Sequence, residues 1–393
     1  MEPASTHAQV LSVVGVLLLA GHAADVLGRR AHVPRVTLLL LLGIAVGPGG
    51  FDLAPAALLD AFPIVTQLSL SLVGFLLGER FLARKHRIPL KGLAQLAATE
   101  TLVTSLFVLT AALLAGQPWP FALLLAGVAP ASAPAATIDV IRESRAEGPV
   151  TNAVLAVVAI DDAYGIVLFS LLLAFAQNLA GFDGGQLAIG VALWEVAGAV
   201  LLGGALGLPM AWLTGQLKRG EPSLVEALGF VLTCSGLAAL LDVSYLLACM
   251  TMGAVVATRA KHHTRPFHAI DGIADPFLVM FFLLAGFEFA PESLSGLGVL
   301  AGCYVVARAA GKIAGGFLGA TVAGSGPVVG RYMGLCVMPQ AGVALGLGLV
   351  AAERFPQWGP QLLSLLVGTT LVFELVGPIA TRFGLRKAGE IPD

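Results

Sequence analysis

The sequence predicts an all-α polytopic membrane protein with about 13 transmembrane helices, built as two inverted six-helix repeats whose broken helices cross in the core. The first observation is composition: 57% of the 393 residues are hydrophobic and 12% are charged, with a mean hydropathy of +0.90. The second is that apolar runs long enough to cross about 30 Å of hydrocarbon recur along the chain. The third is that these runs are continuous and do not alternate every second residue, which excludes a β-barrel.

The apolar runs, taken in order, define thirteen candidate spans. They cover about 8–27, 35–48, 62–79, 90–115, 119–142, 149–177, 187–216, 222–241, 243–258, 270–290, 294–322, 328–352 and 359–384. The first is expected to be a permanent span, because the start of the chain lacks the basic region of a signal peptide.

Basic residues predict how the spans are oriented. Of the 22 lysines and arginines, all but Arg308 and Lys312 inside the eleventh span and Arg354 on the opposite side fall on one face. They are Arg29, Arg30, Arg35, Arg80, Arg84, Lys85, Arg87, Lys91, Arg142, Arg145, Lys218, Arg219, Arg259, Lys261, Arg265, Arg331, Arg382, Arg386 and Lys387. By the positive-inside rule that face is cytoplasmic. We therefore expect a multi-pass protein of a bacterial-type inner membrane, with its N-terminus outside and its C-terminus in the cytoplasm.

An odd number of spans suggests two halves that enter the membrane from opposite sides. Residues 1–178 would form the first repeat, 179–217 a linking span, and 218–393 the second repeat. The fifth span carries Pro130 and Pro134, and its counterpart, the twelfth, carries Pro339, Gln340 and Gly342. Because proline removes a backbone hydrogen bond and clashes with the preceding turn, both spans are expected to be broken at mid-depth.

Charged residues inside the membrane gather in spans four to six and eleven to thirteen, the predicted core. They are Glu100, Asp161, Asp162, Arg308, Lys312 and Glu374. Two adjacent carboxylates cost about 2.5–3.5 kcal/mol each at the centre of a membrane helix, so they require a cation, a proton or a wet cavity. Arg308, Glu100 and Glu374 are interpreted as accessory charges in a structural ion pair, since arginine does not release its proton.

Several motifs resemble the monovalent cation:proton antiporters, in particular the electrogenic Na+/H+ branch with a pair of core aspartates. The matching segments are Ser132-Ala133-Pro134-Ala135-Ala136-Thr137, Gly148-Pro149-Val150-Thr151-Asn152, Val157-Val158-Ala159-Ile160-Asp161-Asp162, Ala307-Arg308-Ala309-Ala310-Gly311-Lys312 and Met338-Pro339-Gln340-Ala341-Gly342-Val343-Ala344. The resemblance implies a homodimer in lipid, in which the spans outside the core form the dimer panel and the core moves against it. It also implies that Asp162 binds the ion or proton, that Asp161 is the partner of Lys312, and that Ser132 and Thr137 adjoin the crossing.

The residues themselves indicate exchange. Sodium takes oxygen ligands, so Asp162 and Asp161 are the predicted Na+ ligands, and protons compete for the same oxygens. We therefore expect an antiporter of Na+, with Li+ and K+ as further cations, and neither an enzyme, a cofactor site nor a nucleic-acid binder. A sodium-coupled solute symporter of related fold stays open as the alternative. An intramembrane aspartyl protease is disfavoured, because its two carboxylates must converge from separate helices.

Overall fold

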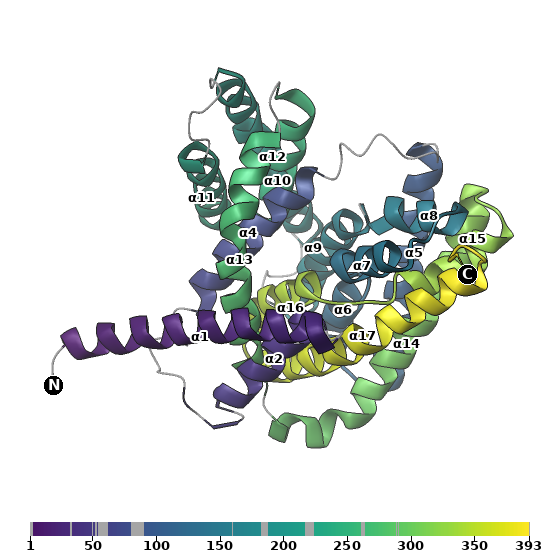
Figure 1. Ribbon diagram of the computed structural model, residues 1–393, viewed down its shortest axis with the longest axis horizontal. Coiled ribbons are helices and arrows are strands. Elements are labelled where there is room, and N and C mark those ends of the chain that lie inside the picture. Colours follow the sequence, from purple (N-terminus) through teal and green to yellow (C-terminus); the bar gives the residue numbers. More distant parts are fainter. Residues whose placement is uncertain are drawn as a thin grey trace.

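The structure, a computed structural model, describes residues 3–31, 34–48, 50–51, 53, 62–79, 90–158, 160–181, 188–216, 224–260, 264–287, 289 and 291–392, and these residues form helices without a strand (Figure 1). The helices are α1 (Pro3–Ala31), α2 (Arg35–Val46), α4 (Phe62–Glu79), α5 (Leu90–Leu114), α6 (Trp119–Val128), α7 (Pro134–Ser144), α8 (Pro149–Val158), α9 (Asp161–Leu179), α10 (Ala188–Gln216), α11 (Leu224–Leu240), α12 (Tyr245–Arg259), α13 (Thr264–Phe287), α14 (Pro291–Ala323), α15 (Pro327–Cys336), α16 (Gly342–Arg354) and α17 (Gly359–Lys387).

The all-α, multi-pass architecture predicted from hydropathy is confirmed. Seven helices in the described ranges are long and apolar enough to cross a membrane, including α5, α9, α14 and α17. Shorter apolar helices such as α6 and α8 are followed by another helix after a short break. Each predicted span thus coincides with one helix or with two half-helices in series, whereas the count of thirteen crossings stays a prediction.

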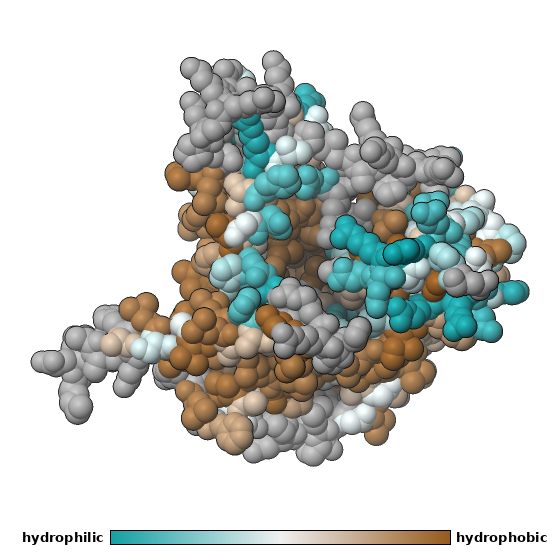
Figure 2. All heavy atoms as spheres, viewed as in Figure 1, coloured by the Kyte–Doolittle hydropathy of each residue, from teal (hydrophilic) through white to brown (hydrophobic). Residues whose placement is uncertain are grey.

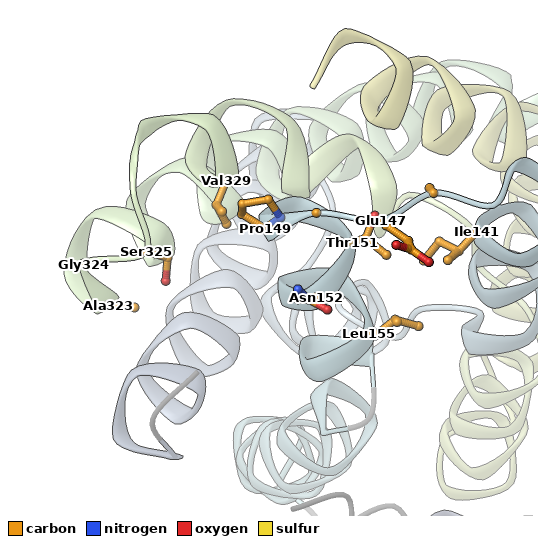
Figure 3. A pocket seen from close by; sticks show the side chains of 12 residues that line it. Ile141, Glu147, Pro149, Thr151, Asn152, Leu155, Ala323, Gly324, Ser325 and Val329 are labelled. Atoms are coloured by element: carbon orange, nitrogen blue, oxygen red, sulfur yellow. The ribbon is translucent and has the colours of Figure 1, made fainter. Parts of the chain in front are cut away.

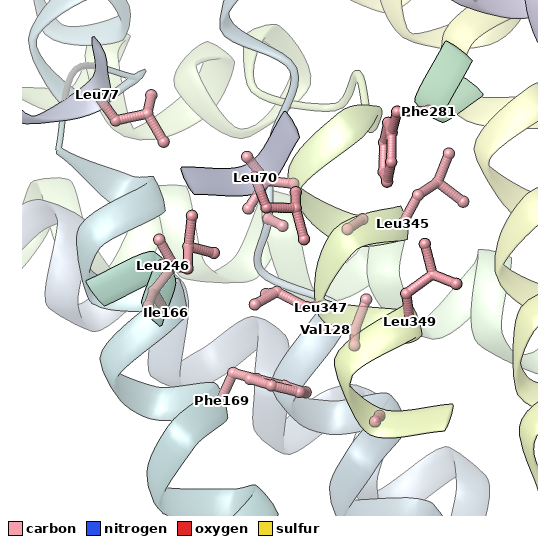
Figure 4. Close-up of a cluster of buried hydrophobic side chains, with 14 of the residues drawn as sticks. Leu70, Leu77, Val128, Ile166, Phe169, Leu246, Phe281, Leu345, Leu347 and Leu349 are labelled. Carbon is pink, nitrogen blue, oxygen red and sulfur yellow. The ribbon is translucent and has the colours of Figure 1, made fainter. Parts of the chain in front are cut away.

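Figure 1 shows two groups of helices. In the first, α10 packs on α12, and α4 packs on both α12 and α13. In the second, α5 packs along α14, α15 packs on α14 and α17, and α9 packs on α5 and α6. Apolar side chains fill the space between the groups, including Leu70 of α4, Leu246 of α12, Phe169 of α9 and Leu345 of α16 (Figure 4). The second group contains every charged residue that the sequence placed inside the membrane.

Hydrophilic and hydrophobic residues occupy different parts of the molecular surface. Figure 2 shows hydrophilic residues where α7, α8 and the C-terminus lie, and a hydrophobic zone over α2 and α17. The exposed residues at the hydrophilic end include Arg142, Arg145, Arg331, Arg382 and Arg386. Some of the basic residues used for the orientation lie outside the described residues. They are Arg80, Arg84, Lys85, Arg87, Lys218, Arg219 and Lys261.

Three glycines spaced four residues apart let α14 lie directly on α5. A Cβ atom at Gly311 would be 2.8 Å from the Cα of Thr104, and one at Gly315 would be 2.9 Å from the Cα of Glu100. At Gly319 it would meet the carbonyl oxygen of Leu96 at 2.7 Å. Small residues at four-residue spacing permit such close approach between membrane helices. The close contact places the α5 face that carries Glu100 against the α14 face that carries Lys312.

Alanine at Gly315 is expected to destabilise the protein by about 1–3 kcal/mol, because its methyl group would overlap the backbone of α5. Gly302 in the same helix is the matched control, since nothing lies within 4 Å of a Cβ there. Gly302→Ala should be neutral or stabilising, because alanine is the better helix former. Thermal unfolding of both variants in detergent checks this, and equal melting temperatures would contradict tight α5–α14 contact.

One element differs from the prediction. The span over 149–177 was expected to be one continuous helix, but α8 ends at Val158 and α9 begins at Asp161. The backbone N–H of Ile160 donates to the carbonyl of Val157 at 2.8 Å, closing a short turn there. Aspartate competes poorly in a helix interior and is favoured in the first turn, where unpaired N–H groups and the positive end of the helix dipole lie. Asp161 and Asp162 therefore lie at the start of a helix and not in its interior.

Candidate functional site

The two predicted broken helices cross, and their unwound segments are hydrogen-bonded to each other. The N–H of Ala133 donates to the carbonyl of Pro339 at 2.9 Å. The hydroxyl of Ser132 donates to Val337 at 3.3 Å, and that of Thr137 to Cys336 at 3.2 Å. Ser132 and Thr137 thus lie at the crossing, and their role in ion binding stays a prediction. Unwound backbone is tolerated at membrane depth only where it is buried in protein or lines a cavity.

Arg308 binds the carbonyl groups that the crossing leaves free. Its Nε donates to Ala129, its Nη1 to Met338 and its Nη2 to Ala131, each at 2.8 Å. Its guanidinium lies 4.2 Å from the centroid of the Phe373 ring. The expected structural ion pair of Arg308 with Glu100 or Glu374 is absent from the described residues. The guanidinium instead replaces the hydrogen bonds that two helices lose where they unwind.

Lys312, one turn further along α14, pairs with Glu100. Its Nζ lies 2.9 Å from Glu100 Oε1, and neither side chain is exposed. The same Nζ donates to the carbonyl of Pro130 at 2.6 Å and to the hydroxyl of Ser132 at 2.9 Å. Thr104 donates to Glu100 Oε1 at 3.1 Å. The resemblance implied Asp161 as the partner of Lys312 and left Glu100 as an accessory charge, whereas Glu100 is the acid in direct contact with the ammonium of Lys312.

Asp161 and Asp162 occupy the first turn of α9 and are 1% and 3% exposed. The N–H of Asp162 donates to Asp161 Oδ1 at 2.9 Å. Asp161 lies within electrostatic range of Arg308. We call Glu100, Asp161, Asp162, Arg308 and Lys312 together the charged centre. α9 packs on α5, α6 and α16. Two carboxylates, a helix N-terminus and a crossing with two cations therefore meet in the second group of helices.

The other predicted residues also lie at or near the crossing. Pro134 begins α7 and Gly342 begins α16. The Nε2 of Gln340 donates to the hydroxyl of Tyr304 at 3.3 Å. Glu374, on α17, is 2% exposed, and its Oε1 has no hydrogen-bond partner among the described residues. No group of three or more His, Cys, Asp or Glu in the described ranges is arranged to hold a metal ion. A cation here would thus need hydroxyl and carbonyl oxygens beside the carboxylates.

A cavity of about 810 Å³ opens at the start of α8, at the hydrophilic end of the molecule (Figure 3). Thr151 and Asn152 of α8 line it, together with Glu147 and, across the opening, Ser325. At one wall the carboxylate of Glu390, near the C-terminus, accepts hydrogen bonds from the N–H groups of Val150 and Thr151 at 2.7 Å and from the Thr151 hydroxyl at 2.8 Å. The end of the chain thereby caps the half-helix that leads to the aspartates.

Replacing Glu390 by glutamine should lower the free energy of unfolding by about 1–2 kcal/mol, because α8 then loses its charged cap. Glu143→Gln removes a carboxylate from an exposed pair with Arg382, which contributes at most about 1 kcal/mol. Unfolding of both variants, together with protease digestion of the C-terminus, measures the difference. A Glu390→Gln protein as stable and as protease-resistant as the Glu143→Gln protein would contradict a cap.

Sequence reasoning placed Arg308 and Lys312 on one helix face but missed Tyr304 and Thr104, although the sequence contained a signal for both. Tyr304 precedes Arg308 by four residues, which places it on the same face. Thr104 follows Glu100 at the same spacing on α5. The cap by Glu390 had no local signal, since 240 residues separate it from Val150.

Known proteins resemble this chain in sequence and in fold. Residues 14–387 match the family model described as sodium/hydrogen exchanger, transmembrane. The ammonium/H(+) antiporter subunit AmhT of Alkalihalophilus pseudofirmus is 23% identical over 379 residues, which cover 95% of each chain. The structure of the sodium proton antiporter MjNhaP1 from Methanocaldococcus jannaschii at pH 8 is similar with a TM-score of 0.76 and 19% identity, over 97% of this chain and 98% of that one. An electron-microscopy structure of the same antiporter gives a TM-score of 0.72 over the whole of both chains, again at 19% identity.

The structural similarity supports the fold, and the family match spans nearly the whole chain. The family and these relatives are transporters and not enzymes, in agreement with the expectation from sequence. The chain belongs to the sodium/hydrogen exchanger family.

Proposed function

We propose that the protein exchanges Na+ for protons by alternating access, with Asp162 as the carboxylate that binds either ion and Asp161 as its partner. The observation that carries the proposal is the buried aspartate pair at the start of α9, next to a crossing whose carbonyl groups are held by Arg308 and Lys312. Buried carboxylates of this kind demand a compensating charge, and a sodium ion and a proton both supply one. Competition for the same oxygens couples the two fluxes.

The groups around Asp161 and Asp162 are suited to binding a cation or a proton in turn. The N–H groups at the start of α9 stabilise the ionised forms of Asp161 and Asp162 while no cation is bound. Hard monovalent cations take carboxylate, hydroxyl and carbonyl oxygens, and half-helices in transporters supply such ligands. Because Lys312 is paired with Glu100 at 2.9 Å, we assign this pair to holding the crossing in shape and the aspartate pair to carrying ions.

We propose that transport is electrogenic, in the manner of the paired-aspartate branch, with two protons moved for each sodium ion. One net charge then crosses per cycle, and 100 mV contributes about 2.3 kcal/mol, equivalent to roughly a fiftyfold sodium gradient. Li+ and K+ are further candidate cations. Ammonium is included because one relative is named an ammonium/H(+) antiporter subunit.

We also propose a homodimer in a bacterial inner membrane, with residues 1–178 and 218–393 as inverted repeats. The exposed apolar side chains of α10 and α11, such as Trp212 and Leu240, fit a surface that faces lipid or a second copy. The exposed arginines at the hydrophilic end support a cytoplasmic location for that end and for the C-terminus. The cavity beside α8 would then be the cytoplasmic access route.

The test uses purified protein in liposomes with a pH-sensitive dye inside. Sodium, lithium, potassium and ammonium gradients are imposed in turn, along with a panel of organic solutes, and currents are recorded on a solid-supported membrane. We expect proton movement opposite to sodium, together with a current. Sodium uptake that requires an organic solute would favour the symporter, and sodium–proton exchange without current would reject the electrogenic proposal.

A further inference from the structure

Glu374 is a buried carboxyl group that the proposed exchange at Asp162 does not use. It lies near the middle of α17 and is 2% exposed, yet its Oε1 has no hydrogen-bond partner among the described residues. No cation of the charged centre is paired with it: Lys312 binds Glu100, and Arg308 binds three carbonyl groups. An isolated ionised carboxylate is very costly in such surroundings, so Glu374 requires a proton or a cation.

The contacts of α17 define what Glu374 faces. Gly377, one turn after it, packs on Pro339, where a Cβ atom would lie 2.7 Å from the proline Cα. On the N-terminal side, Leu366 contacts Gly348 of α16. The two segments therefore run antiparallel, with Thr370 and Glu374 on the turns between these contacts. By this register the two residues lie opposite the stretch that begins with Gln340.

Two more buried oxygens on these facing segments lack partners among the described residues. Thr370 is fully buried and its hydroxyl makes no hydrogen bond with that part of the chain, whereas the neighbouring Thr369 donates to Leu365 of its own helix at 2.9 Å. Gln340 uses its Nε2 for Tyr304 and leaves Oε1 unpaired. Most buried polar atoms in proteins are hydrogen-bonded, so three unpaired oxygens in one region indicate a site for an additional partner.

We propose that Glu374, Thr370 and Gln340 form a second exchange site, which holds a proton on Glu374 until a hard monovalent cation displaces it. The three residues offer a carboxylate, a hydroxyl and a carbonyl oxygen, the donor types that such cations take. The exchange balances in charge: the carboxyl O–H bond breaks, the proton leaves to solvent, and the cation replaces it beside the carboxylate. This inference goes beyond the proposed exchange at Asp162 and does not depend on it.

The site is tested by counting protons. Purified protein in unbuffered detergent solution receives NaCl, and the protons released are measured with a pH electrode and a dye. The wild-type protein should release one proton more than Glu374→Gln. Thr370→Val should raise the sodium concentration needed for that release by roughly tenfold, the equivalent of one lost ligand of about 1.4 kcal/mol. Thr369→Val is the matched control and should leave the release unchanged, because its hydroxyl bonds only within its own helix.

The outcomes separate this site from the proposed function. Asp162→Asn should remove its own share of the released protons and leave the share of Glu374. If folded Glu374→Gln and Thr370→Val proteins release as many protons as the wild type at the same sodium concentration, the second site is rejected and the assignment of Asp162 is untouched. Glu374→Asp retains a carboxyl group and should release the proton at a shifted sodium concentration, which excludes a purely structural effect of the glutamine variant.

Discussion

Asp162→Asn is expected to abolish cation–proton exchange while the protein stays folded. Asparagine has nearly the shape of aspartate but carries neither the negative charge that attracts a cation nor a proton that can leave at neutral pH. Because Asp162 is 3% exposed, removing its charge lowers the cost of burial, so stability should be retained or increased. The measurement is sodium-driven proton movement in liposomes, and we expect less than about a hundredth of the wild-type rate, a change in barrier of about 2.7 kcal/mol or more.

Asp275→Asn is the control for the loss of a carboxylate. Asp275 pairs with Arg35 at 2.6 Å and is 60% exposed at the side chain, so its removal should leave exchange at the wild-type rate. A folded, monodisperse Asp162→Asn protein that still exchanges sodium for protons at the wild-type rate would show that another group carries the ion.

The sequence was sufficient for the helical membrane fold because a bilayer imposes a length and a polarity on every span. Pro130, Pro134 and Pro339 also identified the broken helices, since proline interrupts helical hydrogen bonding wherever it lies. The break before Asp161 was not predicted. No proline marks it, and it depends on the preference of the two aspartates for a helix start over a helix interior.

Partners inside the charged centre were harder to predict, because pairing depends on where helices touch. The four-residue spacing of Arg308 and Lys312 puts both on one face of a helix, but it does not show which acid that face meets. The acid that the resemblance implied for Lys312 was Asp161, and the acid that it contacts is Glu100. The contact between α5 and α14 determines which acid pairs with Lys312. Because Gly315 lets the two helices approach closely at Glu100, Glu100 reaches the ammonium of Lys312. The carbonyl groups bound by Arg308 likewise exist as acceptors only once both helices have unwound and crossed.

The pair Lys312–Glu100 gives the second large expected effect. Lys312→Met should lower the free energy of unfolding by about 3–5 kcal/mol, because it leaves the carboxylate of Glu100 buried without its cation. The carbonyl of Pro130 and the hydroxyl of Ser132 lose a donor in the same step. The free energy is obtained by titrating purified protein with SDS and following the helical circular dichroism signal.

The double variant Glu100→Gln/Lys312→Met separates the stranded charge from the lost hydrogen bonds. Removing both charges avoids burying a lone carboxylate, so the double variant should be about 2 kcal/mol more stable than Lys312→Met. The double variant should then cost less than the sum of the two single variants, as expected for residues in direct contact. Glu100→Gln alone strands the ammonium of Lys312 instead, which keeps two neutral acceptors at 2.6 and 2.9 Å. It should therefore cost less than Lys312→Met. If the effects of the two single variants simply add in the double variant, the pair contributes no coupling and Lys312 must be compensated by another acid.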